Sequence, residues 1–216
     1  MKKYKNILKN REDTVRKLID ILPMGKLKDE NWKLVGVSNG GLKLASLIKG
    51  HLKNELNLLI SEPIFTPNNP TCDVARVSET EEIVINEKLV DSFSIEYDYI
   101  YGEARRKHEQ IILSKIYQYR KGKPFPSAKD EIVLLIDDGS ESGATLVTAL
   151  KTILSMKPKA VYIAVAVLPT DVLELLEPFA DELFYIYAID DFVETSLYYE
   201  NLEEISEEIV EKLLED

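Results

Sequence analysis

Apolar residues along this chain follow two patterns, short continuous runs and longer stretches in which every third or fourth residue is apolar. The continuous runs predict buried strands, at residues 32–37, 56–60, 83–86, 132–136, 160–168 and 183–188. The wider spacing predicts helices, at residues 11–22, 42–51, 98–119, 144–156 and 171–179. Because strands and helices alternate, we predict an α/β fold with a mostly parallel sheet and helices on both faces.

One stretch interrupts this alternation. Between residues 61 and 69 the composition turns to Pro, Asn and Thr, which predicts a long connection of the functional or mobile kind. The chain has no internal repeat and no low-complexity linker. We therefore predict a single domain over residues 1–216, in which about residues 61–125 form an excursion, or hood, over the face that carries the active site.

The strand at 132–136 runs into two adjacent acids, then a loop of small residues, then the helix at 144–156. Ligands of open parallel sheets bind at the carboxyl ends of strands, so this loop is a candidate site. Its backbone amides and hydroxyls can surround a phosphate at the positive end of the helix. Asp137 and Asp138 are expected to face a wet cleft and to accept hydrogen bonds from sugar hydroxyls or hold a hydrated metal. The candidate phosphate-binding residues are Gly139, Ser140, Glu141, Ser142, Gly143, Ala144 and Thr145.

Other interpretations of the acidic pair meet specific obstacles. The metal-binding strand of a nucleotide hydrolase would be accompanied by a Gly-x-x-x-x-Gly-Lys-Ser/Thr loop, and the chain has none. A phosphatase with Asp-x-Asp after the strand is excluded because residue 139 is Gly. A purely structural role remains open, in which Asp138 or Ser140 caps the following helix. The combination of strand, acid pair, small-residue loop and helix favours a ligand site.

Composition and charge narrow the class of protein. The 216 residues are 45% hydrophobic and 30% charged, as in globular proteins, and the net charge of −11 argues against nucleic acid as a partner. The acidity is concentrated in residues 203–216, which we interpret as a solvated helix face. A single cysteine, Cys72, favours a reducing compartment, and neither a signal peptide nor an apolar span of about 18 residues is visible. We expect a cytoplasmic protein with no membrane partner.

The segment Ile136-Asp137-Asp138-Gly139-Ser140-Glu141-Ser142-Gly143-Ala144-Thr145 resembles the ribose-phosphate motif of the type I phosphoribosyltransferases. Ser142 stands where that motif usually has Thr, and it keeps the hydroxyl. The resemblance extends over almost the whole chain, including the helix at 11–22, the Gly40-Gly41 pair, Asn69-Pro70, residues 119–124 and residues 192–202. It implies a type I phosphoribosyltransferase fold with a hood over the active-site face.

The resemblance also implies the parts of a reaction. Asp137 and Asp138 would be the catalytic pair, and the turn Ser38-Asn39-Gly40-Gly41 would bind the pyrophosphate of phosphoribosyl pyrophosphate through its amides. Ser38 or Asn39 as an ordinary helix cap is the alternative for that turn. Mg²⁺ would bridge the substrate oxygens, with Asp137 and Asp138 as its protein contacts through water.

The chain departs from these relatives in its basic residues. They usually carry Pro-Arg before the two glycines and a basic pair after the second strand, where this sequence has Ser38-Asn39 and Ser61-Glu62-Pro63. Losing a guanidinium there removes a few kcal/mol of transition-state stabilisation, on the scale of one preorganised donor. Candidate replacements are Arg76, Lys43 and the Arg105-Arg106-Lys107 cluster.

The expected function is therefore a Mg²⁺-dependent phosphoribosyltransferase that moves ribose 5-phosphate to a nitrogenous acceptor and releases pyrophosphate. A non-catalytic module that binds phosphoribosyl pyrophosphate or a ribonucleotide is the main alternative, and a fold used only for assembly is a third. Phe192, Tyr198 and Tyr199 either stack on an acceptor base or pack in the core. The acceptor and the oligomeric state, with a homodimer as one option, are not determined by the sequence.

Overall fold

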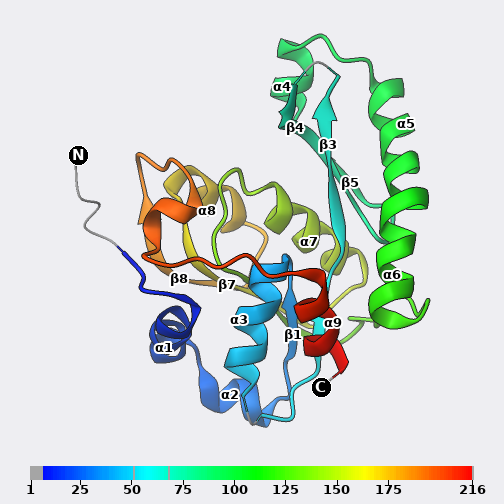
Figure 1. Cartoon of the computed structure of the whole chain (residues 1–216). Helices are drawn as coiled ribbons and strands as arrows, with labels where there is room; N and C mark the ends of the chain where they lie inside the picture. The colour runs from blue at the N-terminus through cyan, green and yellow to red at the C-terminus, as the bar shows by residue number, and fades with distance from the viewer. Residues whose placement is uncertain (1–6, 51, 68, 216) are drawn as a thin grey trace.

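The computed structural model describes residues 7–50, 52–67 and 69–215, and within them the chain forms a five-stranded parallel sheet (Figure 1). The strand order is β2-β1-β6-β7-β8, and every neighbouring pair is parallel. The strands are β1 (Lys33–Gly36), β2 (Leu56–Leu58), β6 (Ile132–Asp137), β7 (Ala160–Pro169) and β8 (Glu182–Ile189). The predicted α/β fold with a mostly parallel sheet is confirmed.

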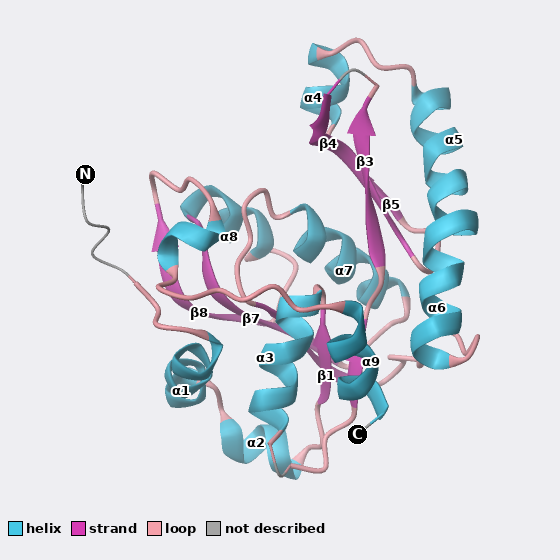
Figure 2. Cartoon of the chain, viewed as in Figure 1, coloured by secondary structure: helices cyan, strands magenta, loops and turns pink. Residues whose placement is uncertain are grey.

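Helices cover both faces of this sheet (Figure 2). One face carries α1 (Arg11–Ile21) and α3 (Asn39–Lys49), with the short α2 (Met24–Asp29) between them, and the other carries α7 (Ala144–Ser155) and α8 (Thr170–Leu176). Strand β6 serves both layers because its side chains alternate. Leu134 and Ile136 pack with α1 and α3, whereas Val133 and Leu135 pack with α7 and α8. All six residues of β6 are buried, which explains why the five before Asp137 are uninterruptedly apolar.

Residues 61–120 build a second, smaller unit beside the parallel sheet (Figure 1). Its antiparallel sheet has the order β3-β4-β5. The strands are β3 (Ser61–Thr66), β4 (Asn69–Ser78) and β5 (Ile83–Ile85). Helix α4 (Glu87–Ser92) then leads to one long helix, in which α5 (Tyr97–Lys107), a π-helical segment η1 (His108–Ile112) and α6 (Leu113–Arg120) follow without a break. We call residues 61–120 the hood.

The prediction of a long connection over residues 61–69 is wrong, because this segment is β3 and the beginning of β4. Asn68 lies outside the described residues, as do His51 at the predicted end of the second helix and Asp216 at the end of the acidic run. The treatment of residues 1–216 as one domain with an excursion stays a prediction.

The carboxyl-terminal segment returns across the molecule. It contains a 3₁₀ turn, η2 (Thr195–Tyr198), and a last helix, α9 (Glu207–Glu215), and between them it passes over α3 (Figure 1). Val210 of α9 is fully buried in a cluster that includes Leu42 of α3 and Ile116 of α6. Glu203, Glu204, Glu207 and Glu208 are exposed, as the charge pattern predicted. Among the described residues, no helix combines the length and the apolar character that crossing a membrane requires.

Candidate functional site

The two acids lie at the carboxyl end of the central strand β6, but they do not face a wet cleft as predicted. Asp137 is 4% exposed and Asp138 is 9% exposed. A buried carboxylate is costly unless other groups pair with it, so the partners of these two side chains define the site.

Asp138 is held by an arginine from the first helix. The Arg11 guanidinium donates from Nε and Nη2 to Asp138 Oδ2, at 2.9 and 2.6 Å. Arg11 Nη1 donates to the carbonyl oxygen of Glu203, at 2.5 Å, and the Tyr199 hydroxyl donates to the carbonyl oxygen of Asp138, at 2.7 Å. The carboxyl-terminal segment is therefore fastened directly to the acid pair.

Asp137 has a different environment. Its Oδ1 accepts from the Ser38 hydroxyl, at 2.5 Å, and from the backbone amide of Asp138, at 3.0 Å. Burial, reinforced by the negative charge of Asp138, raises the pKa of Asp137 to about 8. The Ser38 hydroxyl also accepts from the Gly41 amide, at 2.9 Å, so that one side chain caps α3 and contacts the first acid.

The glycines of the predicted pyrophosphate turn lie inside the first turn of α3, which begins at Asn39 rather than at Leu42. Glycine is needed at both positions because other atoms approach closely. A Cβ on Gly40 would lie 2.0 Å from Asp138 Oδ2, and a Cβ on Gly41 would lie 2.2 Å from the Ile136 carbonyl oxygen. The turn at residues 38–41 and the acids at 137–138, a hundred residues apart, thus form one site.

The predicted phosphate loop connects β6 to the start of α7. Gly143 has a φ of +75°, which favours glycine, and Ala144 begins the helix. The Ser140 amide donates to the Val167 carbonyl oxygen, at 3.0 Å, and is therefore engaged within the protein rather than open to a phosphate. Within the part of the chain that the structure describes, the amides of Ser142, Gly143 and Thr145 have no hydrogen-bond acceptor, which leaves them available to an anion.

Of the basic residues that the sequence offered as replacements, Arg76 is one whose charge reaches the acid pair. It lies on β4, its Nη1 donates to the Ser61 hydroxyl at 3.2 Å, and its positive charge opposes the rise in the pKa of Asp137. Its Nε is buried and has no hydrogen-bond partner among the described residues. Two other candidates are engaged within the hood, since Arg106 pairs with Glu103 at 2.7 Å and Lys107 lies over the Phe65 ring. Arg105 is exposed on the hood helix α5, and Lys43 lies on α3.

Asn39, which occupies the position of the expected arginine, contacts the carboxyl-terminal segment. Its side-chain amide donates to the carbonyl oxygen of Ile205, at 3.2 Å. The same segment approaches the phosphate loop, where the Thr195 amide donates to Glu141 Oε1 at 3.2 Å. A Cβ on Gly139 would lie 2.2 Å from the Thr195 methyl group. Residues 195–205 therefore touch both predicted binding loops.

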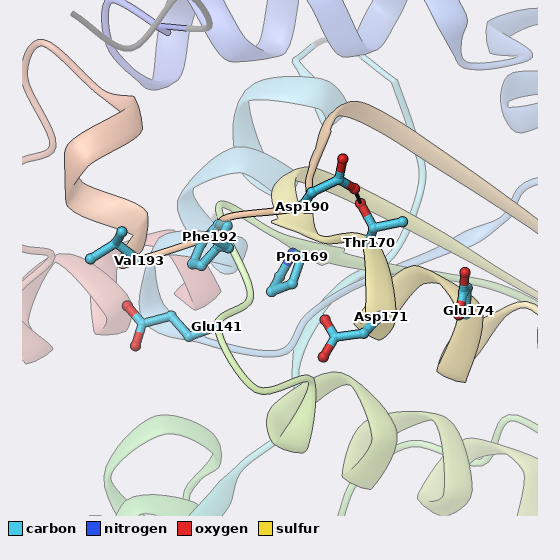
Figure 3. A pocket seen from close by; sticks show the side chains of 8 residues that line it. All are labelled: Glu141, Pro169, Thr170, Asp171, Glu174, Asp190, Phe192 and Val193. Carbon is cyan, nitrogen blue, oxygen red and sulfur yellow. Dashed lines mark hydrogen bonds between the residues drawn. The ribbon is translucent and has the colours of Figure 1, made fainter. Parts of the chain in front are cut away.

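A cavity of about 520 Å³ opens beside the phosphate loop (Figure 3). Four of its lining side chains are acidic, and Phe192 supplies an aromatic ring. The lining residues are Glu141, Pro169, Thr170, Asp171, Glu174, Asp190, Phe192 and Val193. Phe192 stacks on Tyr198 with ring centroids 4.9 Å apart, while Tyr198 and Tyr199 are buried. Of the three candidate aromatics, Phe192 lines the cavity and the two tyrosines pack in the core.

Sequence reasoning missed the contact of Arg11 with the site. Arg11 and Asp138 are 127 positions apart, and an arginine in the first turn of an amphipathic helix gives no sign of such a partner. The described side chains contain no group of three His, Cys, Asp or Glu residues that could hold a metal, and metal contact through Asp137 and Asp138 stays a prediction.

The fold and the site together define a class, the open parallel α/β domains with two acids and a loop of small residues at the end of the central strand. Residues 3–194 match the family model described as the phosphoribosyl transferase domain. The chain therefore belongs to the phosphoribosyl transferase family, and the family recognised from the motif is confirmed.

Relatives are distant. The chain is 22% identical over 182 residues to two Mycobacterium tuberculosis proteins that carry the provisional name phosphoribosyl transferase, covering 84% of this chain and 41% of theirs. It thus spans about two fifths of the length of these curated relatives. Among solved structures it is similar to TT1426 from Thermus thermophilus, with 25% identity, a TM-score of 0.75, and coverage of 96% of this chain and 97% of that one.

Proposed function

We propose that this protein transfers ribose 5-phosphate from phosphoribosyl pyrophosphate to a nitrogenous acceptor and releases pyrophosphate, with Mg²⁺ present. The observation that carries the proposal is the meeting of the Asp137-Asp138 pair, the open amides of the 139–145 loop and the amino terminus of α3 at one edge of the sheet. Each part of the substrate has a matching element. The loop amides can bind the 5-phosphate, the two acids can accept from the ribose hydroxyls, and the amino terminus of α3 can bind the pyrophosphate.

Arg76 supports this assignment because its positive charge reaches Asp137, whose carboxyl group contacts Ser38 next to Asn39. A buried guanidinium with an unused Nε is a donor that a pyrophosphate oxygen can accept from. Glu62, which would oppose an anion, is paired with Lys115 at 2.7 Å. In this proposal Arg76 takes over part of the role of the missing basic residues.

The acid pair fits a Mg²⁺ ion whose direct ligands come chiefly from the oxygens of the substrate. Asp138 forms an ion pair with Arg11, and Asp137 accepts a hydrogen bond from Ser38. Both acids would therefore contact Mg²⁺ through water. When bound, Mg²⁺ supplies charge neutralisation for the departing pyrophosphate. The protein side chains bind and orient the sugar and exclude water from the anomeric carbon.

The cavity beside Glu141 is our candidate for the acceptor site. Its four carboxylates favour an acceptor that carries N–H donors or a positive charge, and Phe192 offers a ring face for stacking. An uncharged purine without exocyclic donors would fit this environment poorly. The single cysteine agrees with a reaction in the cytoplasm.

Calorimetry with phosphoribosyl pyrophosphate and Mg²⁺ tests the binding half of the proposal. Asp137→Asn keeps the size of the side chain and should weaken binding up to about tenfold, as expected for the loss of one hydrogen bond to the sugar. Asp190→Asn, a matched change in the acceptor cavity, should leave this affinity unchanged. Equal affinities for the wild type and Asp137→Asn would reduce the acidic pair to a strand-end feature.

A pyrophosphate-release screen tests the catalytic half. Bases and small amines are supplied with phosphoribosyl pyrophosphate and Mg²⁺, and turnover that Asp190→Asn slows without affecting donor binding would support the acceptor site. A non-catalytic sensor of phosphoribosyl pyrophosphate or a ribonucleotide is the second candidate, favoured by the engagement of Asp138 by Arg11 and of Asn39 by Ile205. Tight binding of phosphoribosyl pyrophosphate with no turnover for any acceptor would favour the non-catalytic sensor.

A further inference from the structure

The long helix of the hood lies at the edge of the molecule (Figure 1), and it carries a row of exposed side chains. Along residues 97–120 the buried apolar residues Ile100, Ala104, Ile112 and Ile116 fall on one four-residue series, whose remaining position, His108, is half-buried. A second row recurs with the same spacing and is exposed throughout. It consists of Tyr97, Tyr101, Arg105, Glu109, Leu113 and Tyr117.

A four-residue spacing would not stay on one face of a regular α-helix, because each step overshoots a full turn by roughly 40°. The π-helical segment His108–Ile112 accommodates more residues per turn and rotates the second half of the helix back. The two halves of the exposed row are thereby kept on one side of the helix over roughly 30 Å.

The row is unusually apolar at both ends. Tyr97, Tyr101, Leu113 and Tyr117 are 43%, 52%, 44% and 73% exposed, and the Tyr97 and Tyr101 rings lie 6.4 Å apart. Large apolar side chains that gather on one exposed face are characteristic of interaction sites. The centre of the row is charged instead, with Arg105 and Glu109, and neither has an ion-pair partner among the described residues.

This order is self-complementary when a second helix runs antiparallel about a two-fold axis near residue 107. Tyr97 then faces Tyr117 of the other copy, Tyr101 faces Leu113, and Arg105 faces Glu109, each pair occurring twice. An isologous interface requires such matching, because one surface must complement itself. A parallel alignment would instead place like charges opposite each other.

Gly102, in the middle of α5, supports close approach of a partner. A Cβ at this position would meet no atom of the described chain within 4 Å, so the fold itself does not require glycine. Glycine inside a helix costs about 1 kcal/mol relative to alanine. A second helix packed across the neighbouring row gives this glycine a physical reason.

We propose that a second copy of this chain docks on the outer face of α5–α6, forming an antiparallel two-fold helix pair with reciprocal Arg105–Glu109 ion pairs. The interface is separate from the acid pair and the phosphate loop, so the inference does not depend on the transferase activity.

Sedimentation equilibrium on the full chain tests the proposal with a charge swap. The wild type should dimerise. Arg105→Glu and Glu109→Arg should each weaken the dimer at least about tenfold, because each places like charges opposite one another. The double variant Arg105→Glu/Glu109→Arg should restore dimerisation, and Lys151→Glu, an exposed charge reversal on α7, should leave it unchanged.

Mixing the two single variants gives the sharpest result. Each is like-charged with itself but complementary to the other, so a heterodimer should form in the mixture while either variant alone is largely monomeric. A wild type that stays monomeric over the whole concentration range would overturn the proposal. So would a dimer that the single charge reversals leave intact, since its interface would lie elsewhere.

Discussion

Two neighbouring carboxylates at the end of β6 have unlike partners. Asp138 forms an ion pair with Arg11, whereas Asp137 receives hydrogen bonds from the Ser38 hydroxyl and a backbone amide. Two buried carboxyl groups side by side repel one another when both are ionised. The arrangement relieves this repulsion, because a guanidinium compensates one charge and the raised pKa of Asp137 favours a proton on the other.

The raised pKa of Asp137 predicts how stability depends on pH. Its folded pKa of about 8 lies above the ordinary value of 3.8, so the native state binds this proton more tightly than the unfolded state. The resulting stabilisation is fully present below about pH 4 and is lost as the pH rises through about 8. Asp137→Asn should remove this contribution, of the order of a few kcal/mol.

Urea denaturation of both proteins between pH 5 and about 8.5 checks this prediction. The free energy of unfolding of the wild type should fall more steeply with rising pH than that of Asp137→Asn. Parallel curves would mean that the side chain is ionised throughout this range.

At the scale of single residues, the sequence pointed to the contiguous candidate residues of the site and missed the contacts between distant ones. Asp137, Asp138 and the 139–145 loop are contiguous, so their chemistry is visible as a motif. Ser38 was expected beside a ligand or as a helix cap, and its hydrogen bond to Asp137 was not anticipated. Contacts such as this and Arg11–Asp138 depend on how the elements pack, which local patterns do not encode.

At the scale of elements, the amino terminus of α3 is the most constrained part of the site. The helix begins with Asn39-Gly40-Gly41 pressed against the end of β6, and the sequence suggested a separate turn because glycines are poor helix formers. Close approach to Ile136 and Asp138 overrides that propensity.

We therefore predict that Gly41→Ala destabilises the protein by at least about 2 kcal/mol, because the new methyl group would lie 2.2 Å from the Ile136 backbone oxygen. Gly25→Ala in α2 is the matched control. A Cβ there meets nothing within 4 Å, and the change should be neutral or slightly stabilising. Urea denaturation measures both, and equal stabilities would show that α3 can shift away from β6 at little cost.

The hood strands illustrate where element prediction fails. Pro63, Asn69 and Pro70 suggested a connection, yet they lie in an antiparallel pair whose register shifts between Ile64 and Thr66. Pro63 lies on the outer strand β3, and Asn69 and Pro70 lie at the end of β4 that does not pair with β5. Such edge positions with irregular pairing tolerate proline and asparagine, which a regular central strand does not. The strands of the parallel sheet were predicted more accurately because burial on both faces leaves them uniformly apolar.

At the scale of the whole molecule, α9 joins the hood to the parallel sheet. Val210 is buried between α3 and α6, next to Leu213 and Leu214. The acid pair is also linked to the same carboxyl-terminal segment through Arg11 and Glu203. Packing at α9 therefore bears on the position of the hood and on the site.

Val210→Ala should lower the free energy of unfolding by about 2 kcal/mol, as expected for deleting buried methyl groups. Ile209→Ala, at a neighbouring position that is 37% exposed, should have a much smaller effect. Denaturation followed by tyrosine fluorescence and by circular dichroism provides the measurement. Equal losses for both variants would show that α9 does not form part of the core.

The sheet order carries a consequence for the assembly of the chain during synthesis. Lys33 of β1 pairs with Val133 of β6, so these adjacent strands leave the ribosome with the whole hood between them. Until β6 emerges, β1 has one open, apolar edge, and such edges promote association with other chains. Parallel pairing over so long a separation is also slow to form. The yield of this protein in a cell should therefore depend on how its unfinished sheet is protected during translation, and not only on the stability of the finished fold.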